Sequence, residues 1–129
     1  MRKILIEISA GELLDKLTIL EIKLKEIKNP SLLQEIKKEY NTLNETKVNN
    51  INSTNELDAL YKSLKETNEK LWKIENKKRL CEKNSDFNDK FIQLARDVYI
   101  ENDKRSKIKL EINKILGSNI KEIKQYTKY

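Results

Sequence analysis

The chain has 129 residues, of which 37% are apolar and 37% charged, and its formal net charge is +6. Two glycines and one proline are too few for the many turns of a β-sandwich or barrel, so the composition favours long amphipathic helices. The absence of histidine excludes His-ligated metals and Ser-His or Cys-His catalysis, and we predict no metal and no cofactor. A chain of this length can bury one core, so residues 1–129 are expected to form a single helical-bundle domain.

The sequence shows no membrane-spanning segment, no signal sequence and no pair of cysteines, which indicates where in the cell we expect the protein. It has no run of about 18 apolar residues, and the apolar run at its start is too short for a signal sequence. The single cysteine, Cys81, cannot form an internal disulfide, which suits a reducing compartment. We therefore expect a cytoplasmic protein with no membrane partner.

The N-terminal segment Lys3–Ile8 (KILIEI) alternates apolar and polar residues. No second strand in the chain could pair with it, so we expect an extended arm or a contact with a dimer partner. Ser9 and Glu12 then form a capping-box pattern. This predicts the start of a helix that runs to about Lys28.

This first predicted helix is apolar on two sides. Leu13, Leu17 and Leu20 follow the spacing of a bundle seam, whereas Ile19 and Ile22 face nearly the opposite way. Such a helix lies either in the centre of a fold or at a subunit interface. Because the chain has few other long helices, we favour the interface and predict a homodimer.

Two further helices are predicted in the middle of the chain. Ser31 starts the second, which extends to about Val48 and is followed by an Asn-rich loop. Ser53 or Thr54 caps the third, whose apolar positions keep heptad spacing as far as Cys81. We expect Cys81 to be buried as an apolar side chain, since no histidine is present to activate it.

The stretch Phe87–Gly117 is predicted to be the fourth helix, with its apolar side chains on one face and Gly117 as its C-cap. The tail, Ser118–Tyr129, is expected to fold back on the helices. Together these patterns predict an all-α fold. We expect an antiparallel bundle of about four long helices with a short extended N-terminal arm and a C-terminal tail.

Arg105 projects from the centre of the apolar face of this fourth helix, with Glu101, Asn102 and Lys109 beside it. A guanidinium in that position needs a carboxylate or a bound anion. One interpretation is a structural ion pair between Arg105 and Glu101. The other is an anion-receptive pocket in which Asn102, Arg105 and Lys109 bind a carboxylate or a phosphate.

Two charged residues of the first helix extend this hypothesis. Exposed charges are one explanation of Asp15 and Lys23, and the other is a pocket that combines either of them with Arg105. The sequence identifies no catalytic residue. The candidate ligand-binding residues are Asp15, Lys23, Glu101, Asn102, Arg105 and Lys109.

Three stretches of the chain resemble a small, uncharacterised helical family found in bacteria and some of their phages. They are ISAGELLDKLTILEIK (8–23), LWKIE (71–75) and LARDVYIENDKRSKIKLEIN (94–113). The resemblance covers nearly the whole chain and implies an all-helical domain without an established activity. In that family the pattern around Asn102, Asp103, Arg105 and Lys109 resembles a signature.

A second resemblance is to the all-helical chorismate mutases. The residues LDKL (14–17) are similar to the start of their long first helix, and Lys23 or Lys25 stands where a basic residue follows. The resemblance implies an intertwined helical dimer that binds a dicarboxylate with Arg and Lys and assists a rearrangement electrostatically. The arginine that these enzymes place near the start of the helix has no match here.

These observations leave three functions open. We favour a helical binding or interaction domain with a small anionic ligand in a pocket on the fourth helix. The alternative is a small enzyme that acts on an anionic metabolite, an isomerase of the chorismate mutase type. Nucleic-acid binding is less expected: residues 104–129 hold eight basic and two acidic side chains, but the excess forms no continuous stripe.

Overall fold

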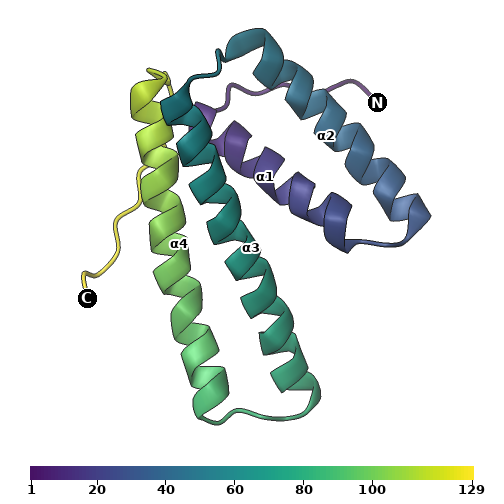
Figure 1. Ribbon diagram of the computed structural model, residues 1–129, viewed down its shortest axis with the longest axis vertical. Coiled ribbons are helices and arrows are strands. Elements are labelled where there is room, and N and C mark those ends of the chain that lie inside the picture. Colours follow the sequence, from purple (N-terminus) through teal and green to yellow (C-terminus); the bar gives the residue numbers. More distant parts are fainter.

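A computed structural model describes all 129 residues and contains four α-helices and no strand (Figure 1). The helices are α1 (Ala10–Glu26), α2 (Pro30–Asn50), α3 (Asn55–Lys83) and α4 (Asp89–Ile115). The predicted all-helical fold is confirmed. None of the helices combines the length and the apolar character needed to cross a bilayer.

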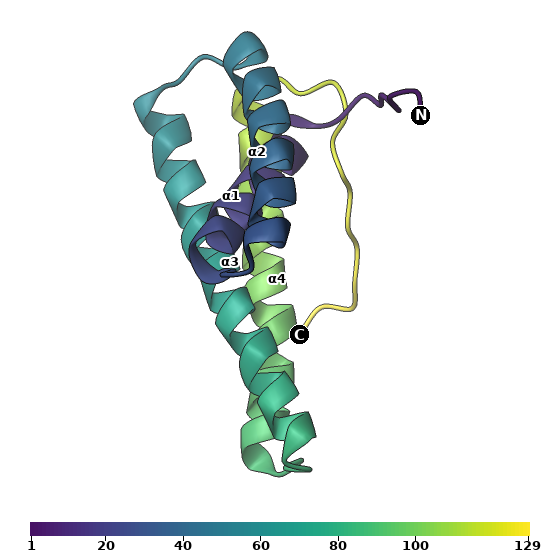
Figure 2. The same cartoon turned by 90° about the vertical axis from the view of Figure 1, so that its right-hand side faces the viewer.

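The arrangement centres on α1, which packs against each of the other three helices. The two longest helices, α3 and α4, lie side by side and are joined by a short turn, whereas α2 packs mainly against α1 (Figures 1 and 2). The half of α3 and α4 near that turn extends beyond α1 and α2 (Figure 1). The main core therefore lies where α1 crosses the other two helices.

The central position of α1 explains why its sequence is apolar on two sides. Leu14 and Leu17 belong to the main core with Leu57, Leu64 and Ile112. On the other apolar face, Ile22 is only 4% exposed in the single chain. The second face is therefore largely covered within one chain, and it gives no reason of its own for a subunit interface. The homodimer stays a prediction, and the N-terminal segment Lys3–Ile8 is the remaining argument for it.

The N-termini of α1 and α2 are each fixed by a capping side chain. The Ser9 hydroxyl accepts a hydrogen bond from the Glu12 amide at 3.1 Å, as predicted for the start of α1. The predicted start of α2 at Ser31 is wrong. Asn29 is the cap, because its side chain accepts from the amides of Ser31 and Leu32, and Pro30 takes the first helical position, which needs no amide donor.

The ends of α3 and α4 follow the same rules. Thr54 caps α3, as one of the two predicted candidates. The helix predicted from Phe87 begins two residues later, because Asn88 caps α4 through the Lys90 amide. At the other end Gly117 has φ +62°, the left-handed conformation expected of a C-terminal glycine. The tail then returns along α4, and Cys81 is buried as predicted.

Candidate functional site

A buried carboxylate, Asp15, lies where α1, α3 and α4 meet, and its residue is only 1% exposed. Arg105 grips it with two donors: Nε lies 2.9 Å from Oδ1, and a terminal nitrogen bonds Oδ2. Asn68 of α3 donates to Oδ1 at 2.9 Å and also to the Thr18 hydroxyl at 2.8 Å. A single carboxylate thus ties three helices together.

Lys109 extends this network one helical turn along α4. Its Nζ lies 2.7 Å from a carboxylate oxygen of Glu12, 3.2 Å from one of Glu122 and 3.8 Å from one of Asp15. Glu12 therefore does not complete the capping box by reaching back to Ser9; its carboxylate turns to Lys109 instead. Because Glu122 belongs to the tail, the same ammonium group also fastens the tail to α4.

The ionisation of the network follows from these contacts. Burial tends to raise the pKa of the Asp15 carboxyl, but the hydrogen bonds from Arg105 and Asn68 and the nearby positive charges hold that pKa below its ordinary value. Burial likewise opposes the charge of Lys109, and its carboxylate partners outweigh that effect and raise its pKa. Asp15, Arg105 and Lys109 are therefore charged at neutral pH.

The other predicted ligand residues lie at the edge of the network or outside it. Asn102 accepts a hydrogen bond from Arg105 at 3.4 Å. Glu101 pairs with Lys104 at 3.1 Å, and its second oxygen is buried without a partner. The predicted structural pair between Arg105 and Glu101 is thus wrong, because Asp15 occupies the guanidinium. Lys23 is half-buried and takes part in no ion pair.

The charges of the network leave little for an external anion at Arg105. The two cations, Arg105 and Lys109, face three carboxylates of the chain itself, from Glu12, Asp15 and Glu122. A bidentate arginine already held by a buried carboxylate has its most directional donors in use. The geometry at this point is that of a structural ion network.

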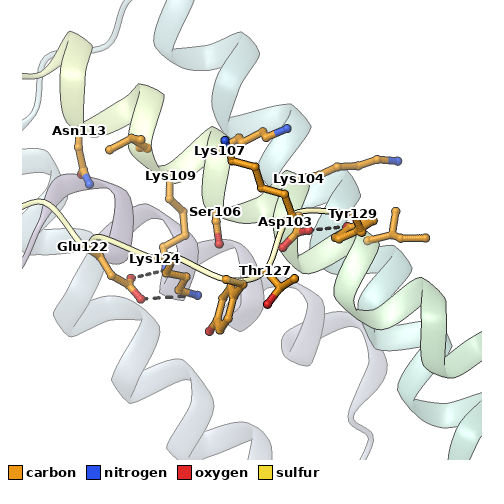
Figure 3. A pocket seen from close by; sticks show the side chains of 14 residues that line it. Asp103, Lys104, Ser106, Lys107, Lys109, Asn113, Glu122, Lys124, Thr127 and Tyr129 are labelled. Carbon is orange, nitrogen blue, oxygen red and sulfur yellow. Dashed lines mark hydrogen bonds and ion pairs between the residues drawn. The ribbon is translucent and has the colours of Figure 1, made fainter.

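A groove opens beside the network, between α4 and the tail (Figure 3). Its volume is about 610 Å³. One end is closed by the pair between Lys109 and Glu122, and the other by a hydrogen bond from the Tyr129 hydroxyl to Asp103. The Tyr129 ring also packs edge-on against Tyr99 of α4, with 5.3 Å between ring centroids. Between these two anchors the tail stands away from the helix (Figure 2).

The walls of the groove are basic. Five lysines line it, Lys104, Lys107, Lys109, Lys124 and Lys128, against the side-chain carboxylates of Asp103 and Glu122. Four hydroxyl-bearing side chains complete the polar lining: Ser106, Tyr126, Thr127 and Tyr129. The first three lysines come from α4 and the other two from the tail. The groove is thus a place where the chain itself concentrates positive charge on two facing segments.

The chain matches, over residues 4–129, the model of a family described as a family of unknown function (DUF6165). The chain belongs to this family. No curated protein and no solved structure matches it. Family membership confirms the resemblance to an uncharacterised domain. It adds no activity, so occurrence in phages and a chorismate mutase type of reaction stay predictions.

Several residues of the site were not predicted from the sequence. Asn68 lies next to the apolar heptad positions of α3 and is buried. An amide side chain next to those positions was the one sign in the sequence that it could belong to a polar site. Asn113 is 2% exposed and accepts from the Gly11 amide at 2.6 Å, which locks α1 against α4. Glu122 and the tail lysines gave no periodic signal at all. They become part of a site only because the tail returns along the helix.

Proposed function

We propose that this domain binds a small, multiply charged anion in the groove between α4 and the tail. The observation that carries the proposal is the lining of the groove, with five lysines against two carboxylates around about 610 Å³. Small-molecule sites commonly have volumes of about 300–1,000 Å³. Lysine ammonium groups bind phosphate and carboxylate oxygens as point charges, so either chemistry suits the groove.

Two of the five lysines are best placed to receive such a ligand. Lys107 and Lys128 form no ion pair with the chain, whereas Lys104, Lys109 and Lys124 each have a carboxylate partner. They also come from opposite walls, one from α4 and one from the tail. An anion with two or more charges would neutralise both and link the walls. A singly charged anion would satisfy only one.

This proposal keeps the predicted anion-receptive function on the fourth helix but moves its centre. Lys109 belongs to both places, since it lines the groove and holds the network. Arg105 instead supports the fold around Asp15. A dicarboxylate receptor of the chorismate mutase kind would need Arg105 and Lys109 free of carboxylates, so the geometry favours a binding domain over that isomerase.

The direct test is titration with inorganic pyrophosphate in a calorimeter, at an ionic strength of about 0.15 M so that diffuse attraction is screened. We expect saturable binding of one pyrophosphate per groove. The double variant Lys107→Gln/Lys128→Gln should weaken it about a hundredfold or more, because each of the two charged hydrogen bonds contributes about 1.5–3 kcal/mol and about 1.4 kcal/mol is a factor of ten.

A matched control separates a site from a general attraction to a basic protein. Lys114 on α4 and Lys121 on the tail are exposed and lie outside the groove. The variant Lys114→Gln/Lys121→Gln therefore changes the net charge by the same amount and should bind pyrophosphate as the wild type does. Equal weakening in both double variants, or no saturable binding by the wild type, would refute the proposal.

A further inference from the structure

The segment before α1 exposes three consecutive large apolar side chains. Ile4, Leu5 and Ile6 are 77%, 85% and 78% exposed, and the segment belongs to no helix. Figure 2 shows it projecting away from the four helices. From Ile8 onward the chain packs on the core, so the projecting part, residues 3–7, is held at one end only. Such a surface indicates an interaction site.

The sequence of these five residues, KILIE, is symmetric in character about Leu5. Ile4 and Ile6 flank the centre, and Lys3 and Glu7 stand outside them with opposite charges. In an antiparallel pair of identical strands that cross at Leu5, positions at equal distance from the centre face each other. Leu5 then meets the partner's Leu5, and each isoleucine meets the other. Lys3 of each chain meets Glu7 of the other.

This register is the one that the charges select. A shift by one residue in either direction places Lys3 opposite an isoleucine, at Ile6 or Ile8, and separates it from Glu7. Opposite charges directly across two strands stabilise their pairing, and a charge set against an apolar side chain does not. A segment that complements itself in this way is better suited to a second copy than to an unrelated protein.

We propose that residues 3–7 of two chains pair as antiparallel strands about Leu5 and join two copies of the protein in a symmetric dimer. Only one polar contact would compete, a hydrogen bond of 2.8 Å between Asn119 and the exposed carboxylate of Glu7. Two short strands alone form a marginal sheet. The dimer should therefore dissociate on dilution, with a dissociation constant on the order of micromolar.

Disulfide trapping tests the register, in a Cys81→Ala background so that the introduced thiols are the only ones. Leu5→Cys should form a disulfide-linked dimer rapidly under mild oxidation, because its Cα atoms would be about 4.5–5.5 Å apart. Ile4→Cys and Ile6→Cys should each cross-link slowly alone. Mixed together, these two should cross-link rapidly. Equal rates at all three positions, or no cross-linking at Leu5, would overturn the proposal.

Charge exchange tests the same pairing by sedimentation of the full chain. Lys3→Glu or Glu7→Lys alone should raise the dissociation constant about tenfold, because symmetry places two like-charge pairs across the strands. The double variant Lys3→Glu/Glu7→Lys should restore the wild-type value. Failure of that rescue, or a wild type that stays monomeric at about 100 micromolar, well above the expected dissociation constant, would refute it. Neither Lys3 nor Glu7 lines the groove, so the Lys3→Glu variant should bind pyrophosphate as the wild type does, and this inference and the proposed function can fail separately.

Discussion

Removing the guanidinium that grips Asp15 is the sharpest test of the ion network. In Arg105→Gln the carboxylate, only 1% exposed, loses its two strongest donors. Removing one partner of a buried pair costs about 3–5 kcal/mol. Lys109 remains 3.8 Å from Asp15 and offsets part of this, so we expect a loss near 3 kcal/mol. Total stabilities are about 5–15 kcal/mol, so the change is large.

The reciprocal variant should be milder, because the two partners are not equally buried. Asp15→Asn leaves behind an arginine whose side chain is 27% exposed and can turn to water, so a loss of about 2 kcal/mol is expected. The double variant should lose less than the sum of the two single variants, since neither charge is then left without a partner. A pair on the surface gives the control. Arg79→Gln, which removes an exposed partner of Glu75, should cost less than about 1 kcal/mol.

The measurement is urea unfolding of the four variants, followed by circular dichroism of the helices and by Trp72 fluorescence. The free energies of unfolding should fall in the order wild type, Arg79→Gln, Asp15→Asn, Arg105→Gln. If Arg105→Gln is as stable as the Arg79→Gln control, the guanidinium has no structural role. If instead it unfolds like the wild type and no longer binds pyrophosphate, the originally predicted pocket at Arg105 is the better account.

Three further changes follow from the same structure. The folded-state pKa of Asp15 lies below its ordinary value of 3.8, so its contribution to stability is present above about pH 4 and is lost as the pH falls through that lower pKa. Between pH 7 and pH 3 the wild type should therefore lose more free energy of unfolding than Asp15→Asn does. Equal losses in the two proteins would contradict this. Gly11→Ala would place a Cβ 2.5 Å from the Lys109 carbonyl oxygen, so it should lower the free energy of unfolding by about 2 kcal/mol, although alanine favours a helix by about 1 kcal/mol. Unchanged or higher stability in urea would show that α1 and α4 can separate there. Glu122→Gln removes a carboxylate that neutralises Lys109 and Lys124, so calorimetry should show pyrophosphate binding a few-fold tighter, and weaker binding would count against the groove.

The helices could be predicted from the sequence because their signals are local. Ser9 and Thr54 cap their helices by accepting from amides a few residues ahead, as predicted. Gly117, predicted as the C-cap of α4, stands one residue beyond the C-cap Leu116, in the left-handed conformation. The error at α2 is of the same kind. Ser31 and Asn29 both suit a cap, and Pro30 between them decides for Asn29, because proline fits the first helical position.

The site was predictable only in part, because its contacts join residues far apart in the chain. Helical periodicity placed Arg105 and Lys109 on one face, and the unusual Asp15 drew attention on α1. Nothing in the spacing could say that Asp15, rather than Glu101, would hold the guanidinium. That choice depends on how α1 crosses α4, and the crossing is made close by Gly11 and Asn113.

Lys109 links the stability of the fold to the proposed binding site. Its ammonium group is shared among Glu12, Asp15 and Glu122, and only Glu122 belongs to the tail. An anion entering the groove would compete with Glu122 for Lys109 and Lys124, and it would compete little with the buried Asp15. Binding should therefore weaken the ion pair between Lys109 and Glu122, which anchors the tail, while the anion's contacts with Lys128 hold the tail from the other side. The fold around Asp15 would stay as it is, because Arg105 and Asn68 hold that carboxylate independently of the tail. On this reasoning the interior network is a fixed support, and the tail is the part of the domain whose position an anion can change.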